Sequence, residues 1–328
     1  MLFRSEIQLK AKMGRGLKNI FNLLHFQIIV FKWFLKNSDK YDVIHAFDLD
    51  TGLPIFIASK LKKKKYVYHI ADFYADSRQG IPKILKKLVR RMEYLVIANA
   101  ETTIICTEER KHQIQGSHPK NLVVVHNTPS RKDEKQLVDN GLFESNNESK
   151  RSITFAYVGS LSENRFIRSV IDIFKCYPEF KLELAGMGKL SDYAEKASQK
   201  YDNIIYHGMV NYSDALVIYS RCDIMFAIYN PKVPNYRYSA PNKVYEAMTY
   251  GKPIIVAKGT SVDKLVENEK MGFSIDYTKQ DFERVLSEIS TDPSILVGMG
   301  INAKNAYPKY SWEEMKKRII SIYEEIQL

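Results

Sequence analysis

The chain has 328 residues, enough for two domains that each bury a core, and its composition of 45% hydrophobic and 27% charged residues excludes a disordered or fibrous protein. Its net charge of +11 is unevenly placed: residues 1–150 contain 26 Lys and Arg against 16 Asp and Glu, whereas residues 151–328 contain 23 against 22. Such a basic half can meet nucleic acid, an anionic substrate or the anionic cytoplasmic leaflet of a membrane.

The most apolar stretch spans residues 17–36. Lysine, asparagine, glutamine and histidine interrupt it too often for a bilayer span of about 20 apolar residues. It therefore predicts a helix that is either buried or lies on a membrane surface. We favour a core helix that covers a sheet, because apolar residues around most of a helix usually mean burial between layers.

Short β-rich runs then alternate with helical patterns. Strands are expected at residues 41–47, 66–72, 102–107 and 121–127, and the longer helices between them at 52–63 and 81–99. This alternation predicts a parallel sheet with helices on both faces.

A polar segment at residues 131–152 indicates a surface linker, after which a second series begins. Its strands are expected at 153–160, 180–188, 203–210, 222–229 and 252–258. Helical patterns lie between these runs, so we predict a second doubly wound α/β domain.

The three cysteines, Cys106, Cys176 and Cys222, lie far apart and within apolar runs. Their spacing fits neither a disulfide framework nor a zinc site. Since no signal-peptide pattern is found either, we expect a protein of the cytosol.

Ligands of open α/β sheets bind beyond the carboxyl ends of the strands, and three such junctions of the second domain draw attention. In YVGSLSENRF, Gly159 ends a strand and Arg165 begins the next helix, an arrangement that suits phosphate as well as a simple turn. In LAGMGK, Gly186 and Gly188 lack the third glycine of a dinucleotide fingerprint, so NAD binding is not expected. A tight turn under a flat ligand such as a base remains possible there.

The third junction is PNKVYEAMTYG, in which Pro241 suits the first helical position and Gly251 stops the helix. Lys243 and Glu246, three residues apart, share one face near the helix N-terminus. Their presence is explained equally well by an ion pair with favourable helix-dipole contacts or by a site for a diphosphate and a ribose diol.

The segment PNKVYEAMTYGKPII resembles the donor site of retaining glycosyltransferases of the GT-B fold, specifically family 4, in which P-x-K-x-x-E-x-x-x-x-G-x-P-x-I recurs. YVGSL, LAGMG, MGFSID and the ending YSWEEMKKRIISIY are similar to further segments of that family. The resemblance covers about residues 41–328. It implies an α/β protein of two Rossmann-like doubly wound domains that face a cleft, the first of them shortened at its start.

The expected parts are an acceptor-side domain at residues 1–145, a nucleotide-sugar domain at 151–306 and a C-terminal helix at 307–328 that crosses back to the first domain.

The resemblance also implies roles for single residues. Glu246 would bind the nucleotide ribose, and Lys243 and Arg165 would neutralise the diphosphate and stabilise the leaving group, with Gly159 near the phosphates. No metal and no other cofactor would then be needed. The family's first glutamate is replaced here by Tyr238, so this residue or Asn242 would recognise the donor sugar.

On the acceptor side Asp72 is the first candidate, because a carboxylate at a strand's carboxyl end could accept or orient the acceptor hydroxyl's proton. His69 is the alternative, although a hydrogen-bonded core imidazole explains it better. The sequence DLD at residues 48–50 invites a metal interpretation, but Asp50 fits a helix cap better.

The helical segment 81–96 combines apolar residues with a cationic remainder; the expected apolar stripe consists of Ile84, Leu85, Leu88, Met92 and Leu95. With the nearby KLKKKK run, this favours peripheral contact with an anionic membrane over a solvated core helix. Nucleic acid is not expected as a partner, because aromatics are not interleaved with the basic runs.

The resemblance thus implies a glycosyltransferase that moves a sugar from a UDP- or GDP-sugar to a glycan or lipid-linked acceptor, in envelope or exopolysaccharide assembly. With the basic first half, we expect it at the inner face of the membrane. The alternatives are a non-catalytic nucleotide-sugar-binding partner subunit and a basic RNA-binding protein.

Overall fold

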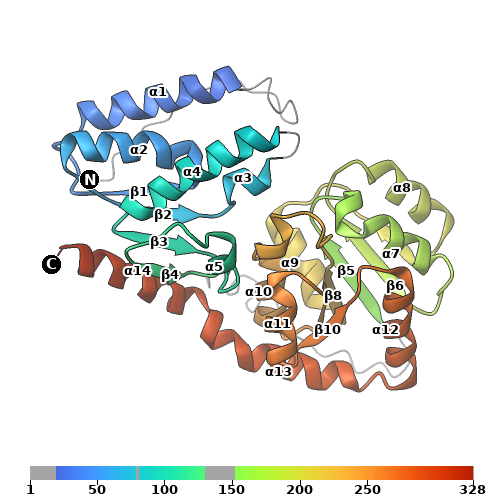
Figure 1. Ribbon diagram of the computed structural model, residues 1–328. Helices are drawn as coiled ribbons and strands as arrows, with labels where there is room; N and C mark the ends of the chain where they lie inside the picture. The colour runs from blue at the N-terminus through green and yellow to red at the C-terminus, as the bar shows by residue number, and fades with distance from the viewer. Residues whose placement is uncertain (1–19, 79–80, 130–151, 328) are drawn as a thin grey trace. The chain divides into compact units, whose positions relative to one another are not determined.

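The computed structural model describes residues 20–78, 81–129 and 152–327 (Figure 1). The chain forms two compact units, one made of the chain up to His126 and from Lys317 onward, the other of Asn127–Lys316. The expected linker at residues 131–152 lies outside the described residues except for its last position. The start of the first domain, expected to be shortened, also lies outside them.

The first unit contains a parallel sheet in the order β1-β2-β3-β4. Its strands are β1 (Val43–Phe47), β2 (Lys65–Ile70), β3 (Thr102–Ile105) and β4 (Leu122–Val124). Its helices are α1 (Ile20–Lys36), α2 (Asp48–Lys62), α3 (Tyr74–Ser77), α4 (Lys83–Asn99), α5 (Arg110–Gln113) and the end of α14 (Trp312–Gln327). The strands are runs of β-branched and aromatic residues, as expected for a sheet covered on its faces.

The expectation that the first apolar helix is a core helix is wrong. Only Val30 of α1 is fully buried, and Phe21 is 80% exposed. The helix packs on α2, so it forms an outer layer of this unit (Figure 1). Because α1 packs on α2 through one side only, its remaining apolar side chains stay exposed.

Helix α2 begins four residues earlier than expected, at Asp48, directly after the strand ends at Phe47, and Asp48 itself has a left-handed backbone conformation with φ +50°. Asp50 therefore lies in the first turn and is not the cap expected from the sequence. Thr51 Oγ1 instead accepts from the Phe47 N–H and donates to the Phe47 carbonyl, at 2.9 and 2.6 Å.

The face by which α4 packs also differs from the expected stripe. Glu93, Val96 and Ile97 are buried, whereas Ile84 and Leu88 are exposed. The helix carries apolar residues on more than one face, and the face that packs is the one with Val96 and Ile97, near its carboxyl end.

The second unit contains a parallel sheet in the order β10-β9-β8-β5-β6-β7. Its strands are β5 (Thr154–Val158), β6 (Lys181–Ala185), β7 (Ile204–Tyr206), β8 (Ile224–Ala227), β9 (Ile254–Ala257) and β10 (Gly272–Ile275). Its helices are α7 (Ile167–Phe174), α8 (Ser191–Lys200), α9 (Tyr212–Arg221), α10 (Asn242–Tyr250), α11 (Ser261–Asn268), α12 (Lys279–Thr291), α13 (Ile295–Tyr310) and the start of α14.

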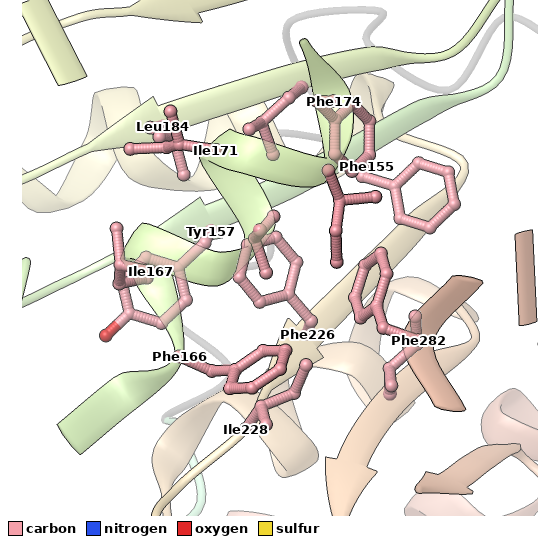
Figure 2. Packing of buried hydrophobic residues seen from close by; sticks show 14 of the residues in the cluster. Phe155, Tyr157, Phe166, Ile167, Ile171, Phe174, Leu184, Phe226, Ile228 and Phe282 are labelled. Atoms are coloured by element: carbon pink, nitrogen blue, oxygen red, sulfur yellow. The ribbon is translucent and has the colours of Figure 1, made fainter. Parts of the chain in front are cut away.

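Aromatic side chains dominate the core of the second unit. Phe155 of β5 lies 5.1 Å from Phe174 and 6.2 Å from Phe282 between ring centroids, which joins the sheet to α7 and α12 (Figure 2). Fully buried aromatic rings contribute most of the apolar area that stabilises such a core. The predicted fold class, two Rossmann-like α/β domains, is confirmed.

Candidate active site

The second sheet reverses its order between β5 and β8. The chain runs from β5 outward to β7 and then returns to place β8 on the other side of β5. In open α/β sheets the crevice beyond the carboxyl ends of the strands at such a switch point is the preferred ligand site. Gly159 follows β5, and the segment after β8 leads into α10, so two of the three junctions noted in the sequence flank this point.

Glycines form a tightly packed floor beside the switch point. Gly159 and Gly186 have φ of +152° and +117°, values that favour glycine. A β-carbon on Gly186 would stand 2.0 Å from the Gly159 carbonyl oxygen, and the Gly159 N–H donates to the Ala185 carbonyl at 2.9 Å. The loops after β5 and β6 therefore touch through their backbones, where a side chain on Gly186 would not fit.

Helix α10 starts at Asn242, one residue later than expected, and Pro241 occupies the N-cap position. Gly251 ends the helix with φ +60°, as the sequence predicts, and its N–H donates to the carbonyls of Ala247 and Met248. Every residue from Val244 to Tyr250 is buried. The N-terminal end of α10 is thus held rigidly, and its partial positive charge favours an anion there.

Lys243 and Glu246 provide the charged groups of this helix end. The ammonium of Lys243 lies 4.8 Å from the Tyr157 ring centroid and 2.9 Å from the place that a β-carbon on Gly159 would take. Burial lowers the pKa of Lys243 to about 8, although Glu246 acts to raise it. Glu246 is buried, and this raises its pKa, while Lys243 and a hydrogen bond with Tyr212 act in the opposite direction.

Arg165 is a second oriented cation. It lies in a 3₁₀ turn, Glu163–Arg165, just before α7, rather than in that helix. Its Nη1 donates to the Tyr229 hydroxyl at 2.5 Å, and its guanidinium lies 4.3 Å from the Tyr229 ring centroid and 5.7 Å from that of Tyr236. Burial acts to lower the pKa of Arg165, but Tyr229, Tyr157 and Tyr236 outweigh it and raise the pKa, so the guanidinium stays charged. Its Nε is buried and has no hydrogen-bond partner among the described residues.

The two candidates for sugar recognition flank the start of α10. Tyr238 is half-buried in the 3₁₀ turn Tyr236–Tyr238, and Asn242 is the exposed first residue of the helix. The structure thus places all seven sequence-predicted donor-site residues in the second unit, in the loops and helix start beyond β5, β6 and β8. Sequence reasoning missed Tyr157, Tyr229 and Tyr236. Tyr157 lies in β5 and Tyr229 just after β8, whereas Tyr236 lies in a 3₁₀ turn and has no local signal beyond being aromatic.

The acceptor-side candidate, Asp72, belongs to the first unit. It is exposed and lies just beyond β2, and its N–H donates to Asp48 Oδ1 at 3.0 Å. His69 is half-buried, with its Nδ1 3.3 Å from His45 Nε2, and burial is the main reason that its pKa falls to about 4. His69 is therefore neutral at physiological pH.

No group of three or more His, Cys, Asp or Glu side chains in the described ranges is arranged to hold a metal ion. Within the same ranges, none of the helices has the length and apolarity needed to cross a bilayer.

Two parallel-sheet Rossmann-like domains, with anion-receptive groups at the switch point of the second, define a protein of the GT-B class. Residues 139–306 match the sequence model of the family described as glycosyl transferases group 1. That match spans half of the chain, and the chain belongs to this family. It is a glycosyltransferase.

Known proteins agree with this assignment. The chain is 24% identical over 319 residues to the uncharacterized glycosyltransferase MJ1607 of Methanocaldococcus jannaschii, which covers 87% of this chain and 75% of the relative. Its fold is similar to that of sucrose-phosphate synthase from Thermosynechococcus elongatus, with a TM-score of 0.73, 15% identity and coverage of 98% and 82% of the two chains. It is also similar to Anabaena HepE in complex with UDP, with a TM-score of 0.69, 18% identity and coverage of 90% and 82%.

Proposed function

We propose that this glycosyltransferase moves a sugar from a UDP- or GDP-sugar to a glycan or lipid-linked acceptor, with retention of anomeric configuration and without a metal ion. The observation that carries the proposal is the position of the Lys243 ammonium, next to the side-chain-free face of Gly159 and one helical turn from Glu246. A cation, a glycine floor and a helix N-terminus at one switch point suit a diphosphate.

The nucleotide diphosphate would lie over Gly159 between Lys243 and Arg165. Glu246 would accept two hydrogen bonds from the ribose diol, because its carboxylate follows Lys243 by one turn of α10. The backbone at Gly186 would lie beneath the nucleotide base, and Tyr238 and Asn242 would contact the donor sugar. The UDP-bound state of the structurally similar HepE supports a nucleotide diphosphate as the ligand of this fold.

In the transfer step, the bond between the anomeric carbon and the diphosphate oxygen breaks, and a bond to the acceptor oxygen forms on the same face of the sugar. Negative charge grows on the departing oxygen, and Lys243 and Arg165 would stabilise it without having to reorganise. The tyrosines around Arg165 keep its guanidinium in one orientation. Asp72 would orient the acceptor hydroxyl or accept its proton.

The exposed surface of the first unit is suited to bind the membrane, where a lipid-linked acceptor would lie. On α4, the apolar side chains of Ile84, Leu88 and Leu95 are exposed beside the exposed cations Lys83 and Lys87. Phe21, Leu24 and Ile28 form a further exposed apolar stripe on α1. Exposed apolar residues with lysines at their side bind anionic interfaces. Envelope or exopolysaccharide assembly is the setting that we propose from the family resemblance alone.

The test is a panel of sugar nucleotides with the purified chain. A UDP- or GDP-sugar at 100 times its dissociation constant should stabilise the fold by about 2.7 kcal/mol, seen as a higher melting temperature. Addition of a glycan or lipid-linked acceptor should then release the nucleotide in the presence of EDTA, and NMR should show a product with the donor's anomeric configuration. Thermal stabilisation without release under any of these conditions would instead favour a non-catalytic donor-binding subunit.

A further inference from the structure

Ionisable side chains from three separate elements hold the segment that carries Asp72. Oδ1 of Asp48 accepts from the N–H groups of Ala71 and Asp72 at 2.8 and 3.0 Å. Nη2 of Arg110, on α5, donates to the Ala71 carbonyl at 3.0 Å. Glu93, on α4, accepts from the Tyr74 N–H at 3.1 Å. The N–H and carbonyl groups of Ala71 and the N–H groups of Asp72 and Tyr74 are thus held by side chains.

Two of these three side chains, those of Arg110 and Glu93, are fully buried. Burial of an ionisable group is costly unless it is well paired, and it raises the pKa of Glu93 to about 8. Arg110 is satisfied by Cys106 and Gln113 at 3.2 and 2.9 Å, and Glu93 by the Tyr68 hydroxyl at 3.0 Å. So many buried polar bonds behind an exposed loop give that loop a single geometry, as a preorganised site requires.

Asp48 contributes in a different way, because it is half-buried and its backbone has φ +50°. Asn and Asp tolerate this left-handed conformation better than other L-residues do, so an Asp suits this position. The parallel register pairs Phe47 with His69, so the carboxyl ends of β1 and β2 lie side by side. The residue after Phe47 is therefore the one that reaches the segment after His69.

We propose that Asp48 is a positioning residue for the acceptor: it fixes the peptide N–H groups of Ala71 and Asp72 and so sets the direction of the Asp72 carboxylate. This inference rests on the proposed function, in which Asp72 orients the acceptor hydroxyl. In this inference Asp48 acts through the backbone of the segment, by accepting from the N–H groups of Ala71 and Asp72.

Three substitutions of one residue separate position from charge. Asp48→Asn keeps an oxygen acceptor at the same place and tolerates the left-handed backbone, so acceptor transfer should stay within about twofold of the parent. Asp48→Glu keeps the charge but displaces the oxygen by one methylene. Asp48→Gly keeps the backbone conformation and removes the acceptor. The Glu and Gly variants should lose about 100-fold in transfer rate, since a misplacement of about 1 Å is enough for that loss.

Two further readouts make the result specific. Donor affinity, measured by thermal shift with UDP- and GDP-sugars, should be the same in all variants. Amide hydrogen exchange at Ala71 and Asp72 should become at least tenfold faster in the Gly variant and stay unchanged in the Asn variant, a difference that needs no activity.

The inference is overturned if the Glu variant transfers like the parent while the Asn variant fails, because charge would then be the decisive property. It is also overturned if the Gly variant keeps both its transfer rate and its slow exchange. Asp72→Ala, which removes both the charge and the oxygen acceptor, separates the proposed function from this inference. Normal transfer by the Asp72→Ala variant refutes the acceptor role of Asp72, whereas its failure beside a normal Asp48→Gly variant refutes only the role of Asp48.

Discussion

The ammonium of Lys243 lies 2.9 Å from the point that a β-carbon on Gly159 would occupy, although the two residues come from different βα units. The absence of a side chain at Gly159 is therefore what admits the cation to the floor of the site. The φ of +152° at Gly159 adds a conformational reason for glycine at this position.

Gly159→Ala should move the Lys243 ammonium and weaken donor binding by about tenfold or more, because the loss of one charge-assisted hydrogen bond is worth about 1.5–3 kcal/mol. The displaced atom is the end of a flexible side chain, so the cost in stability should come mostly from the backbone, about 1 kcal/mol or slightly more. Calorimetric titration with UDP and urea unfolding measure the two quantities. Unchanged UDP affinity would refute the assignment of Gly159 to the phosphate floor.

Gly186→Ala should have the larger effect on stability. Its β-carbon would stand 2.0 Å from a backbone oxygen, where nothing can yield without moving a loop, and φ is +117°. We expect the free energy of unfolding to fall by about 2 kcal/mol or more. Gly298→Ala is the matched control, since nothing lies within 4 Å of its added β-carbon and it lies within α13, where alanine should stabilise by about 0.5–1 kcal/mol.

Donor affinity should fall as the pH rises above about 8. Burial lowers the pKa of Lys243 to about 8, so its ammonium is charged at pH 7 and loses its proton at higher pH, and diphosphate binding favours the charged form. The dissociation constant for UDP should rise by up to tenfold per pH unit between pH 8 and 10. Lys243→Met has no charge at any pH and should bind weakly without this slope. An equal slope in the Met variant would show that another group is responsible.

Glu246→Gln should weaken UDP binding by about 10- to 100-fold, because under the proposed function the buried carboxylate would make charge-assisted hydrogen bonds to the ribose diol that an amide cannot match. The same substitution should leave the affinity for 2′,3′-dideoxy-UDP nearly unchanged. Competition binding with the two ligands gives both numbers from one experiment. Equal losses for both ligands would exclude the ribose as the partner of Glu246.

Removal of two lysines from α4 should weaken binding to anionic vesicles. Lys83 and Lys87 are exposed beside Ile84 and Leu88, and each charge near such a surface is worth about 1 kcal/mol. Lys83→Gln combined with Lys87→Gln should therefore reduce the partition coefficient by roughly 30-fold in a sedimentation assay with phosphatidylglycerol vesicles.

Lys196→Gln, on α8 of the second unit, removes an exposed lysine of the same kind and serves as the control. Neutral phosphatidylcholine vesicles should bind every variant weakly. A double variant that sediments like the parent would refute α4 as the membrane-facing element.

Much of the fold could be read from local patterns. The alternation of strands and helices, the end of α10 at Gly251 and the proximity of Lys243 to Glu246 along one helix all depend on neighbours within a few residues of the chain. Such features follow from side-chain periodicity and turn chemistry, which act before any tertiary contact forms.

The sequence by itself determined the two α/β series and the ends of α10, because these depend on short-range geometry. Only the tertiary structure decided that Lys243 meets Gly159, that tyrosines from β5, the loop after β8 and a 3₁₀ turn surround Arg165, and that Asp48 holds the segment of Asp72. It also decided which faces of α1 and α4 are exposed. The physical reason is that a helix with two apolar stripes, or a loop with several donors, has no local preference between partners, and long-range packing makes the choice.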